Sequence, residues 1–181
     1  MKNSFKTDVH SELIEQCKLG NSMSQYKLYS KYADAMYNVS YNMLHNQHDA
    51  EDVLQISFAN AFNHINRFDY SSTFGAWLKR IVINNSINIL KKKKINFSGE
   101  VEIVTTEVAL ENLEPKYPYN IEEVKSKIAV LPDGYRIVLT LYLIEGYDHI
   151  EIAKILNISV STSKTQYSRA KKKLKELLMT S

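Results

Sequence analysis

Apolar residues recur every three or four positions along most of the chain, a spacing typical of α-helices with one buried face. The pattern predicts helices over residues 8–19, 21–44 and 49–65, and a longer helix from Thr73 to Lys94. At 1.5 Å per residue, the longer helix spans about 33 Å. This length allows one face to lie in a core while a basic end stays exposed.

Residues 95–120 lose this periodicity. Acidic residues gather between Glu100 and Glu123, and Pro115 and Pro118 lie close together, as in a tether. Helical spacing resumes at residues 121–131 and again over 133–145. We therefore expect an all-α protein with two small helical domains, 1–94 and 121–181, which are joined by an acidic linker over 95–120.

The C-terminal domain carries the signature of a helix-turn-helix. Asp148 and Glu151 have the spacing of a capping box, which starts a short helix. Asn157 suits the tight turn that follows, and Ser159 can cap the next helix, residues 160–178. Short polar side chains near the start of such a second helix can reach base edges in the major groove, and later lysines can bind phosphates. The predicted outer face consists of Ser161, Thr162, Lys164, Thr165, Ser168, Arg169 and Lys172.

Composition narrows the possible classes of protein. Glycine and proline number only 5 and 3 among 181 residues, which argues against turn-rich sandwiches, barrels and propellers. No apolar run is long enough to span a bilayer, and residues 1–6 open no signal peptide. The single cysteine, Cys17, permits no internal disulfide. We expect a cytoplasmic protein without membrane insertion.

Charge is distributed in three blocks along the chain. Residues 1–94 carry a net charge of +4, residues 95–125 carry −5, and residues 126–181 carry +4. Two basic modules separated by an acidic segment favour a protein that meets a polyanion at two places, although solvated surfaces alone produce such charges as well.

The sequence contains little that suggests catalysis. His45 and His48 lie near Asp49 and Glu51, as metal ligands can, but a polar helix end explains them better. Phosphate-binding GxxxxGK[ST], nucleophile GxSxG and zinc HExxH motifs are absent. We expect no enzyme activity, no metal and no cofactor.

Two segments resemble the bacterial RNA polymerase sigma factors, in the order those proteins have them. Residues 49–58 (DAEDVLQISF) and 74–81 (FGAWLKRI) resemble sigma region two. Residues 131–178, with their helix-turn-helix, resemble region four. A chain with these two regions, a short tether and little else resembles the small extracytoplasmic-function (ECF) group.

The resemblance implies specific roles. It implies docking on the RNA polymerase core for Asp49, Asp52 and Gln55. It implies recognition and opening of the minus-ten promoter element for Asp69, Tyr70, Ser71, Ser72, Lys79, Arg80, Asn84, Lys91 and Lys92. It implies recognition of the minus-thirty-five element for the outer face of the second helix listed above. Promoter DNA and an anti-sigma factor are the other implied partners.

Alternatives remain at several positions. Tyr70 can stack on an extruded base or belong to an ordinary turn, and Trp77 is better explained as a core residue than as a stacking one. Four positions depart from the sigma pattern: Ile83, Asn85, Asn88 and Ser163. Ser163 stands where an apolar residue usually locks the two helices, and Tyr167 is expected to provide that packing.

Two rival functions remain at this stage. One is a stand-alone helix-turn-helix regulator that binds duplex DNA. The other is a helical enzyme or metalloprotein that uses His45, His48 and Cys17.

Overall fold

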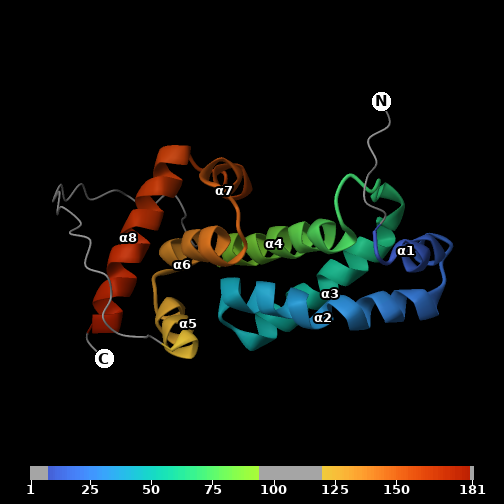
Figure 1. The fold of residues 1–181 in the computed structure, drawn as a ribbon, viewed down its shortest axis with the longest axis horizontal. Helices are drawn as coiled ribbons and strands as arrows, with labels where there is room; N and C mark the ends of the chain where they lie inside the picture. The colour runs from blue at the N-terminus through green and yellow to red at the C-terminus, as the bar shows by residue number, and fades with distance from the viewer. Residues whose placement is uncertain (1–7, 94–119, 180–181) are drawn as a thin grey trace. The chain divides into compact units, whose positions relative to one another are not determined.

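The computed structural model describes residues 8–93 and 120–179 (Figure 1). The chain forms two compact units, residues 1–94 and 95–181. Every regular element of the described residues is a helix, which confirms the predicted all-α class. The expected linker lies outside the described residues except for Asn120, so Pro115 and Pro118 are not described.

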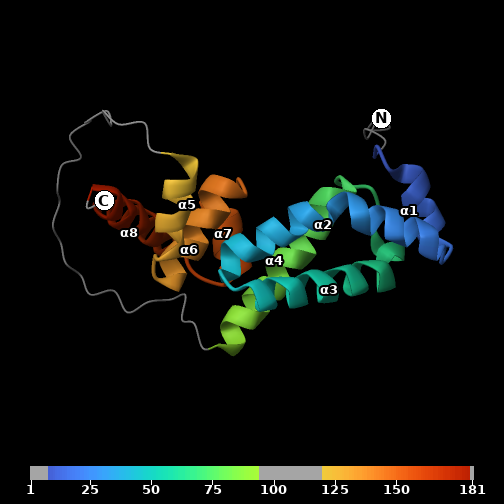
Figure 2. The same ribbon diagram turned by 90° about the horizontal axis from the view of Figure 1, so that it is seen from below.

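The first unit is a small helical bundle. Its elements are α1 (Ser11–Lys18), α2 (Ser22–Leu44), α3 (Gln47–Asn63), one 3-10 turn η1 (Ile65–Arg67) and α4 (Phe74–Lys92). Helices α2, α3 and α4 pack against one another, and α1 packs on α2 and η1 at one end (Figures 1 and 2). The loop between η1 and α4 therefore lies at the same end as α1.

Buried serines lie among the large apolar side chains of this bundle. The Ser40 hydroxyl donates to the Tyr37 and Ala50 carbonyls at 2.9 and 3.2 Å, and the Ser57 hydroxyl accepts from Asn85 Nδ2 at 2.9 Å. Small side chains let the helices approach closely, and each of these hydroxyls has a partner. The apolar core consists of Leu28, Met36, Met43, Val53, Phe58, Phe74, Leu78, Val82, Ile83 and Leu90.

Side-chain caps begin the three main helices. Asn21 accepts from the Ser24 amide at 3.0 Å, Asn46 from the Asp49 amide at 3.0 Å, and Thr73 from the Ala76 amide at 3.2 Å. The expected start of α3 at a capping Asp49 is therefore wrong. Asn46 has the extended backbone that a cap requires, whereas Asp49 already lies within the helix.

The second unit contains α5 (Ile121–Ala129), α6 (Asp133–Leu139), a π-helical stretch η2 (Thr140–Ile144), α7 (His149–Leu156) and α8 (Val160–Met179). Helix α8 packs against α5, α6 and α7. The single helix expected over 133–145 is continuous but changes from α to π geometry at Thr140. One part of the core joins Leu131, Leu139 and Ala170, with Ile128, Tyr135, Tyr167, Leu174 and Leu177 against it.

The helix-turn-helix has the predicted caps. The Asp148 carboxylate accepts from the amides of Ile150 and Glu151 at 2.8 Å, and Glu151 accepts from the Asp148 amide at 2.9 Å. Asn157 takes the left-handed turn at φ 57°. Ser159 Oγ accepts from the Thr162 amide at 2.9 Å, so it caps α8.

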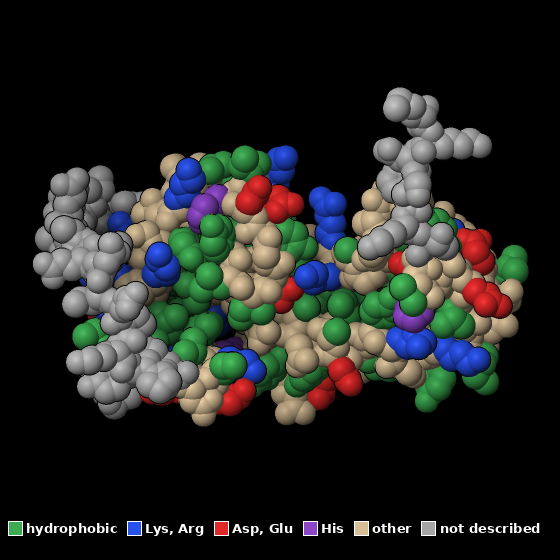
Figure 3. Space-filling model, in the orientation of Figure 1, with side chains coloured by type: hydrophobic (Ala, Val, Ile, Leu, Met, Phe, Trp, Pro, Cys, Tyr) green, Lys and Arg blue, Asp and Glu red, His purple; other side chains and the backbone are tan. Residues whose placement is uncertain are grey.

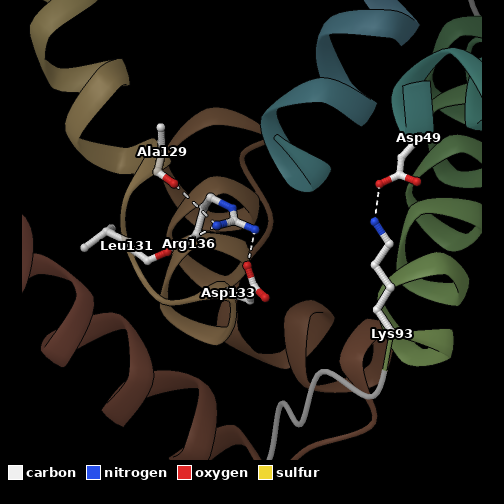
Figure 4. A network of polar contacts seen from close by, with 6 residues as sticks. All are labelled: Asp49, Lys93, Ala129, Leu131, Asp133 and Arg136. Carbon is white, nitrogen blue, oxygen red and sulfur yellow. Dashed lines mark hydrogen bonds and ion pairs between the residues drawn. The ribbon is translucent and has the colours of Figure 1, made fainter. Parts of the chain in front are cut away.

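A buried arginine joins α5 to α6. Arg136 is 6% exposed, pairs with Asp133, and donates to the carbonyls of Leu131 at 3.2 Å and Ala129 at 3.5 Å (Figure 4). Because carbonyl groups at the C-terminal end of a helix lack partners within the helix, this guanidinium satisfies the end of α5.

Candidate functional site

One face of α8 carries most of the side chains predicted to read DNA. Helical residues are separated by about 100° around the axis. Ser161, Lys164, Thr165, Ser168 and Lys172 therefore share one stripe, and all five are exposed. The buried Ser163, Gln166 and Ala170 lie on the opposite side. Thr162 and Arg169 lie at the edge of the stripe and are half-buried.

Hydroxyl groups cluster at the start of α8. Ser159 Oγ lies 2.8 Å from both Ser161 Oγ and Thr162 Oγ1. One turn later, the Thr165 hydroxyl donates to the Ser161 carbonyl at 2.9 Å. The amide end of the helix also carries partial positive charge, so this end of α8 suits a phosphate or a base edge.

An aromatic and polar contact locks α7 to α8. The Ser163 hydroxyl is fully buried and lies 2.9 Å from His149 Nδ1. The His149 ring stacks on Tyr142 at 4.7 Å between centroids, and Tyr167 packs on Tyr142 at 4.4 Å and on His149 at 5.5 Å. Burial, helped by the Lys164 ammonium, lowers the pKa of His149. Tyr167 provides the expected packing, and Ser163 replaces an apolar contact with a hydrogen bond.

The loop before α4 presents three of its four predicted DNA contacts. Asp69, Ser71 and Ser72 are exposed, and Asp69 Oδ1 accepts from the Ser71 amide at 3.0 Å. The hydrogen bonds from Ser71 lower the pKa of Asp69, which keeps it ionised. The fourth residue, Tyr70, turns toward α1, where its hydroxyl donates to Glu15. Trp77 packs on Phe68 and Phe74, as a core residue does.

The predicted phosphate contacts of α4 do not all share one face. Arg80, Asn84 and Lys91 lie on one exposed stripe, and Asn88 joins them. Lys92 is exposed at the end of the helix. Lys79 is half-buried and lies about 100° from Arg80 around the axis, so it is separate from that stripe. From the sequence, Asn88 was noted only as a departure from the sigma pattern. Its spacing of four residues from Asn84 nevertheless places it on the same face of α4.

The predicted stripe of α3 contains an apolar residue that sequence reasoning missed. Asp52 and Gln55 are exposed, and Ile56 beside them is 49% exposed. Asp49 lies at the edge of this stripe, where its carboxylate pairs with Lys93 at the end of α4 (Figure 4). Ile56 thus adds an apolar side chain to the exposed polar stripe of Asp52 and Gln55.

The second unit also exposes apolar side chains. Leu143 and Ile144 of η2 and Ile150 of α7 are 54%, 45% and 56% exposed. Figure 3 shows hydrophobic side chains at the surface over α6 and α7. Sequence patterns alone do not identify such an exposed apolar patch.

The metal hypothesis finds no support in the geometry. His45 ends α2 in a left-handed conformation at φ 51°, and its ring packs against Tyr41. His48 is exposed on α3, and Cys17 is buried. Within residues 8–93 and 120–179, no three His, Cys, Asp or Glu side chains are grouped as metal ligands. In the same residues, no helix is both long and apolar enough to cross a membrane.

Comparison with known proteins decides the family. Residues 28–95 match sigma-70 region 2, and residues 121–174 match sigma-70, region 4. The chain is 34% identical over 176 residues to the ECF RNA polymerase sigma factor SigW of Bacillus subtilis. The aligned region covers 91% of this chain and 94% of SigW. The chain is an ECF sigma factor. The ECF RNA polymerase sigma factor SigM of the same organism is another relative. It is 30% identical over 152 residues, a region that covers 83% of this chain and 93% of SigM.

Two solved structures share the fold. The sigma factor RpoE of Bartonella quintana, in complex with the anti-sigma factor NepR, aligns with a TM-score of 0.57 at 21% identity, covering 85% of this chain and 96% of RpoE. CnrH, in complex with the cytosolic domain of CnrY, aligns with a TM-score of 0.54 at 24% identity. The alignment covers 93% of this chain and 96% of CnrH.

Membership of this family fixes the general function. As a sigma factor, the protein directs transcription initiation with RNA polymerase and promoter DNA, and sigma factors are initiation factors rather than catalysts. The rival of a stand-alone regulator is not favoured, because the region 2 match accounts for the N-terminal unit. The departure at Ile83 is also explained. Its side chain is 1% exposed in the core, so it does not face DNA.

Proposed function

We propose that residues 121–181 recognise the minus-thirty-five element through α8. The observation that carries this proposal is the exposed stripe from Ser161 to Lys172, opposite the buried face of the same helix. Its first residues are short and polar, as contacts to base edges require, and Lys172 lies further along, where a phosphate contact is expected. Thr162 and Arg169 flank the stripe and complete the predicted contacts.

Residues 1–94 are proposed to bind the polymerase core and to open the minus-ten element. Asp52, Gln55 and Ile56 form the docking surface, with Asp49 at its edge. The exposed loop side chains Asp69, Ser71 and Ser72 offer hydrogen bonds to an extruded base. Arg80, Asn84, Lys91 and Lys92 hold the backbone, with Lys79 outside their stripe.

Strand opening in this proposal needs no bond chemistry from the chain itself. Unstacked bases that bind in a polar site offset the cost of leaving the duplex. Residues 95–120 act as the tether between the two DNA contacts. The protein works in the cytoplasm, where polymerase and chromosome meet, and without a cofactor.

An anti-sigma factor is the proposed regulator. The two solved structures described above are complexes of sigma factors with an anti-sigma factor and with CnrY. The exposed apolar residues Leu143, Ile144 and Ile150 supply a surface that a protein partner can cover.

The first experiment is transcription from a promoter library by core RNA polymerase, with and without this chain. We expect a set of promoters that share two elements at fixed spacing to be transcribed only when the chain is present. Tight binding of the free chain to duplex DNA, without any transcription in the presence of core, would instead support a stand-alone regulator.

Variants then test the recognition face. Thr165→Ala and Lys164→Ala should each lower use of the selected promoters about tenfold, the effect of losing one good base or phosphate contact. Lys125→Ala is the matched control, because Lys125 is exposed on α5 and pairs with Glu122 of the same helix, far from the α8 stripe in sequence. Equal activity of all three variants would exclude α8 as the reading helix.

A second pair of variants tests core binding. Asp52→Arg should weaken assembly with core polymerase at least tenfold, because it places a cation within the docking stripe. Asp34→Arg makes the same charge change at an exposed position of α2 and should leave assembly unchanged. Competition with labelled wild-type chain for a limiting amount of core measures both.

A further inference from the structure

Tyr70 has an unusual backbone conformation in the loop before α4. Its φ is 62°, in the left-handed region that bulky side chains rarely enter. Such a conformation persists when the surroundings hold it, and it occurs most often at functional sites. The contacts around Tyr70 show what holds it.

Two residues of α1 hold the Tyr70 side chain. Its hydroxyl donates to Glu15 Oε1 at 2.6 Å, and Lys18 Nζ lies 4.7 Å from the centre of its ring. Lys18 also pairs with Glu15 at 2.9 Å, and the Phe68 ring packs on Tyr70 at 4.7 Å between centroids. Burial and the Glu15 carboxylate raise the pKa of Tyr70, and the Tyr70 hydroxyl lowers the pKa of Glu15. The phenol is therefore a hydrogen-bond donor to an ionised carboxylate.

Helix α1 is itself fixed beside this loop. Ile14 and Cys17 are buried on its inner side. The buried Asp8 carboxylate accepts from the His10 amide at 2.8 Å and from the Phe74 amide, the first residue of α4, at 2.7 Å. Asp8 thus ties the start of α1 to the start of α4, on either side of the loop.

We propose that Glu15 and Lys18 are positioning residues for minus-ten recognition. They hold Tyr70 against α1, so that Asp69, Ser71 and Ser72 remain exposed as the side chains that contact the extruded base. Tyr70 is then a positioning residue as well, since its ring is engaged with α1 and does not stack on DNA. This inference rests on the proposed function of the loop.

The test uses holoenzyme assembled from core polymerase and the full chain, on a promoter recovered from the library. The promoter carries 2-aminopurine in the minus-ten element, which reports opening, and each minus-ten position is also varied to all four bases. The variants are Glu15→Gln, Tyr70→Phe, the double variant of these two, and Tyr70→Ala, which removes the ring altogether. Glu12→Gln is the matched control, because Glu12 is exposed on the same helix.

We expect Glu15→Gln and Tyr70→Phe each to slow opening about fivefold and to weaken the base preference at one minus-ten position, as expected when a hydrogen bond to a charged group is lost. The double variant should be no slower than the slower single variant within about twofold, because both substitutions act on the same hydrogen bond: Tyr70→Phe removes its donor, and Glu15→Gln removes the charge of its acceptor. Core affinity and the unfolding midpoint should stay at the wild-type values. Glu12→Gln should open promoters at the wild-type rate, because the contacts that hold Tyr70 are with Glu15 and Lys18 rather than with Glu12.

Three outcomes would overturn the proposal. Glu15→Gln behaving like Glu12→Gln, while Tyr70→Ala abolishes opening, would place the Tyr70 ring on DNA directly. A fall in the unfolding midpoint that parallels the loss of opening would make the contact merely structural. Failure of the unmodified chain to open any promoter with core would overturn the proposed function as well, whereas normal opening by Glu15→Gln overturns this inference alone.

Discussion

Ile83 and Arg136 are single residues whose surroundings fix their roles. Ile83 lies in the core of the first unit, and Arg136 is buried against the end of α5 in the second. Ile83 does not have the role that the sigma pattern gives its position, and Arg136 does not have the exposure that its chemical type suggests. In the sigma pattern a basic residue is usual where this chain has Ile83, and arginines are usually exposed.

Substitution at Ile83 should affect stability rather than DNA binding. Ile83→Val should lower the free energy of unfolding by about 1 kcal/mol and Ile83→Ala by about 3 kcal/mol, because each leaves a cavity in a packed core. Urea unfolding followed by the fluorescence of Trp77 measures both. Weaker promoter opening by Ile83→Val, at unchanged stability, would contradict this assignment.

Arg136→Ala should destabilise the second unit by about 2 kcal/mol. The substitution removes the partner of Asp133 and leaves the carbonyls of Leu131 and Ala129 without this donor. Amide hydrogen exchange measures the effect locally, since exchange should accelerate in α5 and α6 while α2 to α4 provide an internal reference. Arg136→Lys should recover only part of the loss, because an ammonium lacks the forked geometry of guanidinium.

At the scale of elements, the contact between the two helices of the helix-turn-helix includes a titratable side chain, His149. The two helices meet at His149, Ser163, Tyr142 and Tyr167. The charged groups that influence His149 are Lys164 of α8, which lowers its pKa, and Asp148 at the start of α7, which raises it. Burial has the largest effect and favours the neutral ring.

This contact predicts a dependence of stability on pH. The folded pKa of His149 lies below its ordinary value of about 6.5, so the unfolded chain binds more protons between the two values. The stabilisation is therefore complete above about pH 7 and is lost as pH falls from about 6.5 toward the folded pKa. Titration of the His149 ring by NMR, together with the Tyr142 and Tyr167 ring signals, tests this directly.

His149→Phe is the matched variant for that measurement. It retains an aromatic ring against Tyr142 but has no proton to gain, so the pH-dependent change in the Tyr142 and Tyr167 signals should disappear. A wild-type His149 pKa above 6.5 would contradict the prediction. The other four histidines, His10, His45, His48 and His64, all lie in the first unit, so the His149 ring is the imidazole of the second unit.

At the scale of the whole molecule, the two basic segments, residues 1–94 and 126–181, should produce a strong dependence of promoter binding on salt. Each phosphate that the holoenzyme neutralises contributes about 0.9 to the slope of log affinity against log salt concentration. Lys172→Gln should therefore reduce the slope by about one, whereas Lys125→Gln should leave it unchanged. Binding of the holoenzyme that does not vary with salt would show that the assigned phosphate contacts are wrong.

Much of the fold could be predicted because helix ends are local events. The caps at Asn21, Thr73, Asp148 and Ser159 involve residues no more than three positions away, so the sequence contains all of their partners. The α8 stripe follows in the same way from helical spacing alone. Asn46 was missed because Asp49, three residues later, is also a good capping residue.

Some of the burial could not be predicted from one helical face. Phe74 and Ile83 are nine residues apart and thus on opposite sides of α4, yet both are buried. A helix packed on two sides has no single apolar face, so helical spacing alone does not identify Ile83 as a core residue.

The amino-acid pattern alone determined the helical class, the two modules, the capped helix-turn-helix and the side chains on the outer face of α8, because each depends on neighbours within a few turns. The tertiary structure decided that Tyr70 meets Glu15 across 55 positions, that Asp49 meets Lys93 across 44, and that Ser163 meets His149. These contacts form only when helices distant in sequence pack together, and no local propensity specifies which side chains will then face each other.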